Sequence, residues 1–192
     1  DTILKIVEKT AEEVFIPWTV GGGVRTIENI QNLLKAGADK VSINSAAIKD
    51  PNIIKSSSKF FGSQCIVVAV DVKKNHTSWK VHSHGGTKNT NIDALDWLKK
   101  VEDLGAGEIL LTSMDKDGTK SGFDLEVLSR ANDILSIPVI ASGGVGSIEH
   151  FYDGVKTGKA DALLAASVFH FNEFSIMDVK NYLKEKNIEV RI

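Results

Sequence analysis

The sequence predicts an α/β domain built on a parallel sheet, and three observations support this. Short apolar runs alternate with amphipathic stretches along all 192 residues, and most of the runs are continuously apolar. No G-x-G-x-x-G or G-x-x-x-x-G-K-[ST] fingerprint follows a first strand. Continuous apolar strands fit a sheet covered on both faces, and strand–helix alternation gives parallel pairing. Together these observations favour a (β/α) barrel over an open nucleotide-binding sheet.

The apolar runs are the expected strands, and a helix precedes them. Residues 1–14 carry acidic residues throughout and are typical of a helix rather than a signal peptide. The strands are expected at residues 18–22, 40–44, 65–71, 108–114, 138–144 and 162–167.

The helical patterns between the strands have recognisable starts and ends. Helices are expected over 26–37, from Asp50 onward, over 93–105 and from Ser175 onward. Asp50, which precedes a proline, and Ser175 are typical N-cap residues. The glycines that close the segments 26–37 and 93–105 are typical helix terminators. The chain therefore predicts a leading helix and six strand–helix units.

Composition excludes several classes of protein. Hydrophobic residues make up 42% and charged residues 25%, values close to the globular average and far from those of disordered chains. The net charge is -2 without a basic stripe, so nucleic acid is not an expected partner. No apolar run approaches 18 residues, so no membrane span is expected. The single cysteine, Cys65, suits a reducing compartment, and a cytoplasmic location is expected.

An internal repeat indicates how such a barrel would be built. Residues 16–46 resemble residues 137–167 at an offset of 121, with one extra residue, Lys159, before the last matching serine. This offset suits two duplicated half-barrels of four units each. A complete barrel has eight units and about 250 residues. The sequence is therefore expected to be one barrel domain over 1–192 that holds strands 3–8 and lacks about 50–60 N-terminal residues, with the first two strands.

Two glycine loops are candidate phosphate sites. Residues 21–23 and 142–144 follow matching strands and precede helices, where backbone N–H groups favour an anion. Asn44-Ser45 and Ala166-Ser167 end the strands next to them and would complete each cradle. Each loop alone could equally be an ordinary strand–helix turn. The duplication favours two phosphate sites on one barrel mouth, and thus a substrate with a phosphate at each end.

Asp71 is the candidate acid–base residue because it closes an apolar strand at the edge where barrel active sites lie. A solvated strand end or a helix cap is the alternative reading. The polar loop 114–124 suits substrate binding, although a hydrophilic connector has the same composition. His82 and His84 alternate on one expected strand, but no third ligand has metal spacing, so no metal site is expected.

Several segments resemble one enzyme family. The matching motifs are TVGGGV (19–24), GADKVSIN (37–44), VVAVD (67–71), GAGEILLTSMDKDGTKSGFD (105–124), VIASGGVG (139–146) and AASVFH (165–170). They are similar to the cyclase subunit of imidazole glycerol phosphate synthase, a lyase of histidine biosynthesis. The resemblance runs in order along the whole chain and implies a (β/α)8 TIM barrel.

The resemblance implies a reaction as well as a fold. Ammonia from a glutaminase subunit would attack a bis-phosphate substrate, the ribulosyl-formimino form of aminoimidazole carboxamide ribonucleotide. Ring closure and carbon–nitrogen cleavage would then give imidazole glycerol phosphate and aminoimidazole carboxamide ribonucleotide. Two aspartates would act as general acid and base, with no metal or redox cofactor. Asp71 matches one of them, and the other would lie on a first strand that this sequence does not contain.

The resemblance also carries further roles to named positions. The implied set is Gly23, Asn44 and Ser45 for one phosphate; Gly118, Gly144, Ala166 and Ser167, beside Ser142 of the glycine loop, for the other; Thr112 and Asp117 for the substrate cleft; Lys40 and Glu108 for a charged ammonia entrance; and Asp39 for contact with the glutaminase. A stabilising ion pair at the barrel bottom is the alternative reading of Lys40 and Glu108.

Two other functions stay open on the sequence. The related isomerase of the same pathway shares the barrel, the phosphate sites and the paired acids, but needs no ammonia. A non-catalytic phosphate-binding barrel fragment is the other alternative. The pair Lys40 and Glu108 favours the cyclase, and so does the sequence of residues 105–124.

Overall fold

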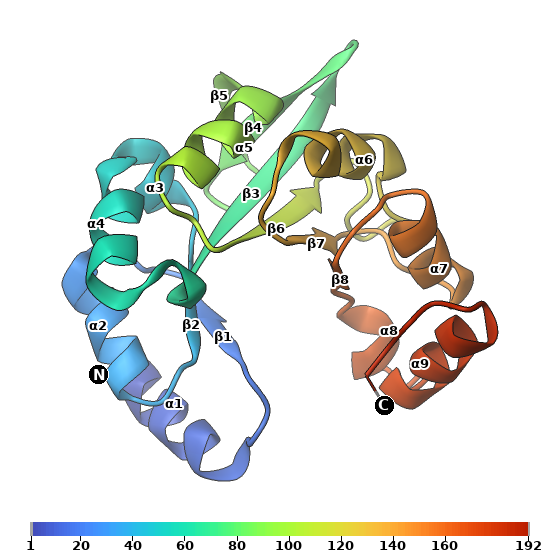
Figure 1. The fold of residues 1–192 in the computed structure, drawn as a ribbon, viewed down its shortest axis with the longest axis horizontal. Coiled ribbons are helices and arrows are strands. Elements are labelled where there is room, and N and C mark those ends of the chain that lie inside the picture. The colour runs from blue at the N-terminus through green and yellow to red at the C-terminus, as the bar shows by residue number, and fades with distance from the viewer. Residues whose placement is uncertain (1, 192) are drawn as a thin grey trace.

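A computed structural model describes residues 2–191 and shows a curled parallel sheet with helices on its convex side (Figure 1). The strands are β1 (Thr19–Gly21), β2 (Lys40–Ile43), β3 (Ile66–Asn75), β4 (Ser78–Ser83), β5 (Lys88–Asp93), β6 (Glu108–Ser113), β7 (Val139–Ser142) and β8 (Ala162–Leu163). The helices are α1 (Thr2–Glu13), α2 (Ile27–Lys35), α3 (Ser45–Lys49), α4 (Asn52–Phe61), the 3-10 turn η1 (Ser63–Cys65), α5 (Ala94–Asp103), α6 (Leu125–Ile134), α7 (Glu149–Lys156), α8 (Ser167–His170) and α9 (Ile176–Glu185).

The sheet order confirms the predicted fold class. The strands follow β1-β2-β3-β6-β7-β8, and every neighbouring pair on this path is parallel. Each chain crossover returns to the next strand through helix, as in a (β/α) barrel. Within residues 2–191, β1 and β8 each pair on one side only, so the sheet forms an open arc with α1 near one end and α8 and α9 near the other (Figure 1).

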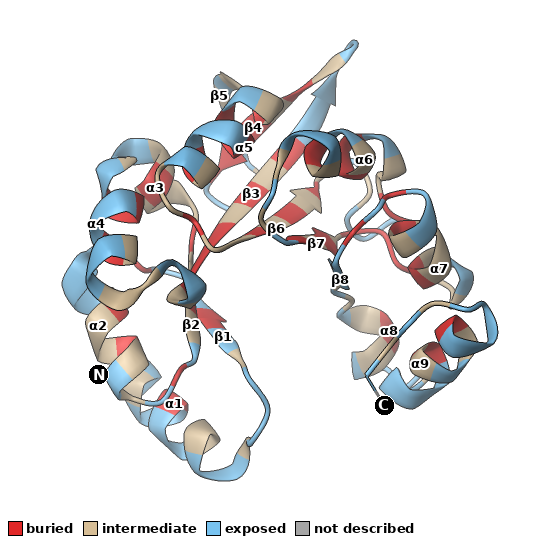
Figure 2. Cartoon of the chain, in the orientation of Figure 1, coloured by how far each residue is buried: buried red, intermediate tan, exposed pale blue. Residues whose placement is uncertain are grey.

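The prediction that both faces of the strands are covered is wrong for the described residues. Side chains toward the helices are buried, as in β6, where Ile109 and Leu111 are at most 1% exposed. Side chains on the concave face alternate with them and keep partial exposure, as Glu108, Leu110 and Thr112 do. Figure 2 shows the buried positions on the strands and on the helix faces turned toward them. The core therefore lies between the sheet and its outer helices.

Two strands end four residues away from their expected ends. β3 does not end at Asp71 but continues to Asn75, because an antiparallel hairpin of β4 and β5 pairs with its second half. β8 spans only Ala162–Leu163, and the chain turns into α8 at Ser167. β4 and β5 thus form a regular two-stranded extension of the sheet after β3.

The predicted helix boundaries are largely confirmed by capping. Ser175 accepts the Asp178 N–H at 3.1 Å in a reciprocal capping box, and Thr26 does the same for Asn29. Helix α4 begins at Asn52, one residue later than expected, with Pro51 at the N-cap position. The Asp50 carboxylate still accepts the N–H of Asn52, at 3.1 Å. None of the helices within residues 2–191 is long and apolar enough to cross a membrane.

The internal repeat is visible in the backbone. Asn29 Oδ1 accepts the N–H groups of Arg25 and Thr26 at 3.1 and 3.2 Å. At the offset of 121, His150 Nδ1 accepts the N–H groups of Gly146 and Ser147 at the same two distances. His150 therefore accepts hydrogen bonds from the turn that leads into α7. An asparagine and a histidine thus accept the same pair of backbone hydrogen bonds in the two halves.

Candidate active site

The candidate catalytic residues meet at the carboxyl edge of the sheet. Because all strands on the main path are parallel, their C-terminal ends share one edge. Asp71 of β3 is in register with Thr112 of β6, which is in register with Ser142 of β7. These three side chains form a row on the concave face, where the burial pattern leaves each of them partly exposed. The structure therefore brings together residues spread over more than a third of the chain.

Asp71 lies in an environment that perturbs its ionisation. Burial raises the pKa of its carboxyl, and the neighbouring carboxylate of Asp117 raises it further. A hydrogen bond from Asn44 Nδ2 to Asp71 Oδ2, at 2.9 Å, and the charge of His82 act in the opposite direction. A carboxyl with a raised pKa is better placed to exchange protons near neutral pH than an ordinary aspartate. This site is therefore suited to general acid–base chemistry.

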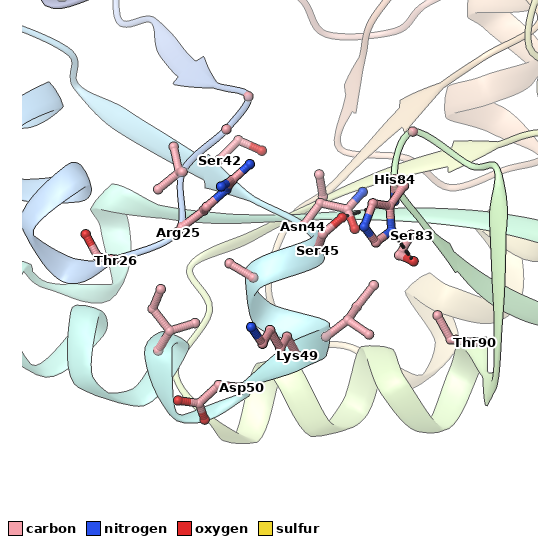
Figure 3. A pocket seen from close by; sticks show the side chains of 18 of the residues that line it. Arg25, Thr26, Ser42, Asn44, Ser45, Lys49, Asp50, Ser83, His84 and Thr90 are labelled. Atoms are coloured by element: carbon pink, nitrogen blue, oxygen red, sulfur yellow. Dashed lines mark hydrogen bonds between the residues drawn. The ribbon is translucent and has the colours of Figure 1, made fainter. Parts of the chain in front are cut away.

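The first glycine loop lines a large open cavity. Gly23, Asn44 and Ser45 border a space of about 1350 Å³ together with Arg25 and His84. Figure 3 shows Asn44 and Ser45 on one wall, with His84 next to them. Nothing occupies the space beside the Cα of Gly23, whose φ of +71° leaves its backbone open to an approaching group. The three expected residues are thus gathered at one accessible cradle.

Asn44 has unused hydrogen-bonding capacity in this cradle. Its Nδ2 donates to Asp71, whereas its Oδ1 is buried without a hydrogen-bond partner among the described residues. A buried carbonyl oxygen left unpaired is costly, and a ligand N–H or O–H would satisfy it.

The second glycine loop is built differently, by close packing against the loop after β6. Gly144 has a φ of +102°, and a Cβ there would lie 2.2 Å from the carbonyl oxygen of Gly122. The N–H of Gly122 in turn donates to the Gly144 carbonyl at 2.7 Å. This contact holds the polar loop 114–124, with Asp117 and Gly118, against the end of β7. Gly118 has open space beside its Cα, like Gly23.

The two cradles share one backbone conformation at the next strand end. Asn44, which precedes α3, has φ -129° and ψ -91°. Its counterpart Ala166, which precedes α8, has φ -110° and ψ -70°. Ser45 and Ser167 therefore begin their short helices in the same way. The extra residue Lys159 lies in a left-handed turn at φ +59°, outside the cradle.

The opposite edge of the sheet holds an ion pair. Lys40 Nζ of β2 bridges to Glu108 of β6, across the intervening β3. The two side chains are 28% and 20% exposed, so the pair is partly desolvated. Next to it, exposed Asp39 accepts the Trp18 N–H at 3.0 Å, a contact that Asp161 repeats with Val139 at 2.9 Å in the second half. Asp39 thus fixes the backbone before β1, whether or not it also contacts a partner protein.

Sequence reasoning missed His82. Its pairing with His84 on one strand face was wrong, because His84 lies beyond β4 at a φ of +55°. His82 stays on the strand, is 8% exposed, and is the antiparallel partner of Asp71. The register of the hairpin places His82 opposite Asp71. Short polar strands give no sequence signal for their register, so this contact could not be predicted. Within residues 2–191, no three His, Cys, Asp or Glu side chains converge as a metal site requires.

Fold and site together define a (β/α)-barrel protein with a partly buried carboxylate between two duplicated glycine loops. The chain belongs to the family described as histidine biosynthesis protein, whose model matches residues 1–175. It is 56% identical over 191 residues to the imidazole glycerol phosphate synthase subunit HisF of Natranaerobius thermophilus. That match covers 100% of this chain and 76% of the relative. The family expected from the sequence motifs is thereby confirmed.

Proposed function

We propose that this protein is the cyclase of imidazole glycerol phosphate synthase, a carbon–nitrogen lyase that uses ammonia from a glutaminase partner. Its substrate would be the ribulosyl-formimino form of aminoimidazole carboxamide ribonucleotide. The products would be imidazole glycerol phosphate and aminoimidazole carboxamide ribonucleotide. The observation that carries the proposal is the position of Asp71, a partly buried carboxylate between two matching cradles. The similarity to the HisF subunit supports the choice of reaction.

The cradles suit the two ends of a bis-phosphate substrate. Gly23 and Ser45 would hold one phosphate, and Gly144 and Ser167 the other, through backbone N–H groups and hydroxyls. Gly118 and Ala166 would add backbone contacts on the second side. Their shared backbone conformation supports equivalent roles, because the same anion requires the same arrangement of donors.

Asp71 would move protons on the reacting part of the substrate between these cradles. Its carboxylate, once ionised, can accept a proton from the attacking ammonia or from a carbon acid, and the resulting acid can return it to a leaving nitrogen. Asn44 holds one carboxyl oxygen at 2.9 Å and so fixes the direction of the other. Thr112 and Asp117 would line the cleft around it, and Ser142 of the second glycine loop would lie with the second phosphate. A second acid from a first strand would complete the pair.

The Lys40–Glu108 pair marks the ammonia entrance in this proposal. It lies at the amino edge of the sheet, opposite Asp71, so ammonia would cross the barrel from one edge to the other. Exposed Asp39 on the same edge would contact the glutaminase. Partial burial of the ion pair supports a gate, since a desolvated charge pair excludes bulk water and discriminates by charge.

We also propose that two further strand–helix units close the barrel between β1 and β8. The open edges of these strands and the exposed apolar side chains nearby, with Phe15 at 90% and Phe171 at 69%, support this. The intact mass of the natural protein tests it. A mass about 6 kDa above 20.8 kDa is expected, at roughly 110 Da per residue over the missing units. A mass of 20.8 kDa would contradict the proposal.

The decisive experiment is ammonia-dependent turnover of the bis-phosphate substrate by the full-length protein. The wild type should form imidazole glycerol phosphate only when ammonia or glutamine with the partner is supplied. Asp71→Asn should lower turnover by a factor on the order of 100 or more, because proton transfer contributes 10²–10⁴-fold. The related isomerase reaction needs no ammonia, so ammonia-independent conversion would point to that enzyme instead. Phosphate binding without any turnover would indicate a binding module.

A further inference from the structure

His82 is a buried titratable residue that the proposed mechanism does not use. It lies on β4 and is 8% exposed. β2 pairs with the first part of β3, Ile66–Val68, and β4 pairs with β3 from Asp71 onward. At Asp71 the neighbouring strand on this side is therefore β4. Paired residues in an antiparallel ribbon share one face, with Cβ atoms about 5 Å apart. His82 therefore stands directly beside the catalytic carboxylate.

The backbone fixes the imidazole in place. His82 Nδ1 lies 3.1 Å from the carbonyl oxygen of Lys80, and only a ring N–H can bond there, so Nδ1 carries a proton. Nε2 has no hydrogen-bond partner among the described residues. The ring is therefore held by its own strand in a fixed position beside Asp71.

The charged groups around this position come from several elements. Lys73 and Lys80 lie two residues further along β3 and β4 on the same face, and Lys80 is compensated by Asp93 at 3.7 Å. Asn89 of β5, the next residue in the row, is neutral. Asp117 approaches from the loop after β6 and repels the charge of Asp71. Within this set, His82 is the direct cross-strand neighbour of Asp71.

We propose that His82 is a positioning residue for the reaction, an imidazole held opposite Asp71 that favours the ionised carboxylate. This rests on the proposed function of Asp71. The cation on His82 opposes the rise in the pKa of Asp71 that burial and Asp117 cause. The carboxylate therefore remains available as a proton acceptor to lower pH than its burial alone would allow.

The test is the pH profile of ammonia-dependent kcat/KM in the full-length protein. Asp71 must be ionised to accept a proton, so activity falls on the acid side as pH drops through its pKa. Removing the neighbouring cation in His82→Gln raises that pKa, and the acid limb should move upward by about 0.5 to 1 pH unit. His82→Lys, which restores a cation, should return the limb to its wild-type position or below. His76→Asn, an exposed histidine at the tip of the same hairpin, is the matched control.

A merely structural role for His82 predicts a different result. Both variants would then lose activity equally at all pH values while the acid limb stayed in place, and this would overturn the proposal. A second measurement needs no turnover: the ¹³C resonance of the Asp71 carboxyl, assigned by its loss in Asp71→Asn, should titrate at higher pH in His82→Gln. An unchanged titration would refute the role of His82. Absent turnover in the wild type would refute the proposed function alone.

Discussion

Asp71 shows how one residue can combine a cost in stability with a function. Burying a carboxylate opposes its ionisation, and only the Asn44 amide and the His82 charge offset this among the causes identified. The preceding residue on the same face of β3 is Ala69, which is apolar and also partly exposed, so the sheet itself does not require a carboxylate here. The raised pKa therefore supports the proposed role of Asp71 in proton transfer.

A second residue-scale prediction concerns Gly144. Gly144→Ala should lower the free energy of unfolding by about 2 to 4 kcal/mol, since left-handed strain and a Cβ 2.2 Å from the Gly122 oxygen act together. Gly22→Ala is the matched control, because Gly22 has a similar positive φ of +94° but open space around it. Strain alone should cost this control about 1 to 2 kcal/mol. Equal losses in urea denaturation would show that the packing of the two loops is unimportant.

At the scale of elements, Glu102 joins the end of α5 to the turn before β7. Its carboxylate accepts from Lys99 Nζ at 2.6 Å and from the N–H and hydroxyl of Ser136 at 2.6 and 2.7 Å. Burial alone would raise the pKa of Glu102, but these three hydrogen bonds outweigh it and lower the pKa to about 2. The bond network therefore stabilises the fold when Glu102 is ionised.

Glu102→Gln should accordingly destabilise the protein by about 1.5 to 3 kcal/mol at pH 7, the usual contribution of hydrogen bonds to a charged group. Because the folded pKa is depressed, this contribution is complete above the ordinary value of 4.5 and is lost as pH falls toward about 2. The stability difference between variant and wild type should shrink over that interval. Glu126→Gln on α6, whose side chain is 46% exposed, should have a much smaller effect, because exposed ion pairs contribute little to stability. Denaturant titrations at several pH values decide this, and a difference independent of pH would contradict it.

At the scale of the whole molecule, the two edges of the sheet carry different groups. Asp71 and the two glycine loops lie at the carboxyl edge, and the Lys40–Glu108 pair lies at the amino edge. In the proposed function these edges are joined by the passage of ammonia through the barrel. The role of the Lys40–Glu108 pair is therefore tested by the ratio of glutamine-driven turnover to turnover with free ammonia.

Glu108→Gln should lower glutamine-driven turnover relative to turnover with saturating free ammonia. We expect the ratio to fall by roughly 3- to 10-fold, as losing a charge contact of about 1 kcal/mol implies. Lys159→Gln is the control, since its ion pair with Asp133 is about half exposed and lies at the same edge, but before β8 and not beside Lys40 and Glu108. If Glu108→Gln leaves the ratio at the wild-type value, the pair is a structural ion pair only. Both activities are measured with the glutaminase partner at saturation.

The strands and helix caps were predictable because their signals are local. Continuous apolar runs identified all six strands of the parallel path, and capping residues such as Ser175 identified helix starts within one or two residues. Asp71 and the glycine loops were predictable for a related reason, since parallel strands bring all their C-terminal ends to one edge. Side-chain pairs across strands carry no such signal. His82 opposite Asp71 and Gly144 against Gly122 depend on register and loop packing, which single positions do not encode.

The sequence by itself determined the fold class, the duplication and the family of this protein, because periodicity, repeat and motif are properties of residue order. Tertiary structure alone decided the electrostatic environment of Asp71. Asn44, Asp117 and His82 come from three different segments, and charge interactions depend on distance in space. It also showed that Asn29 and His150 cap equivalent helices, since a nitrogen acceptor and an amide oxygen meet the same backbone donors. Residue order specifies the elements, and the chemistry of the site arises only where folding brings them together.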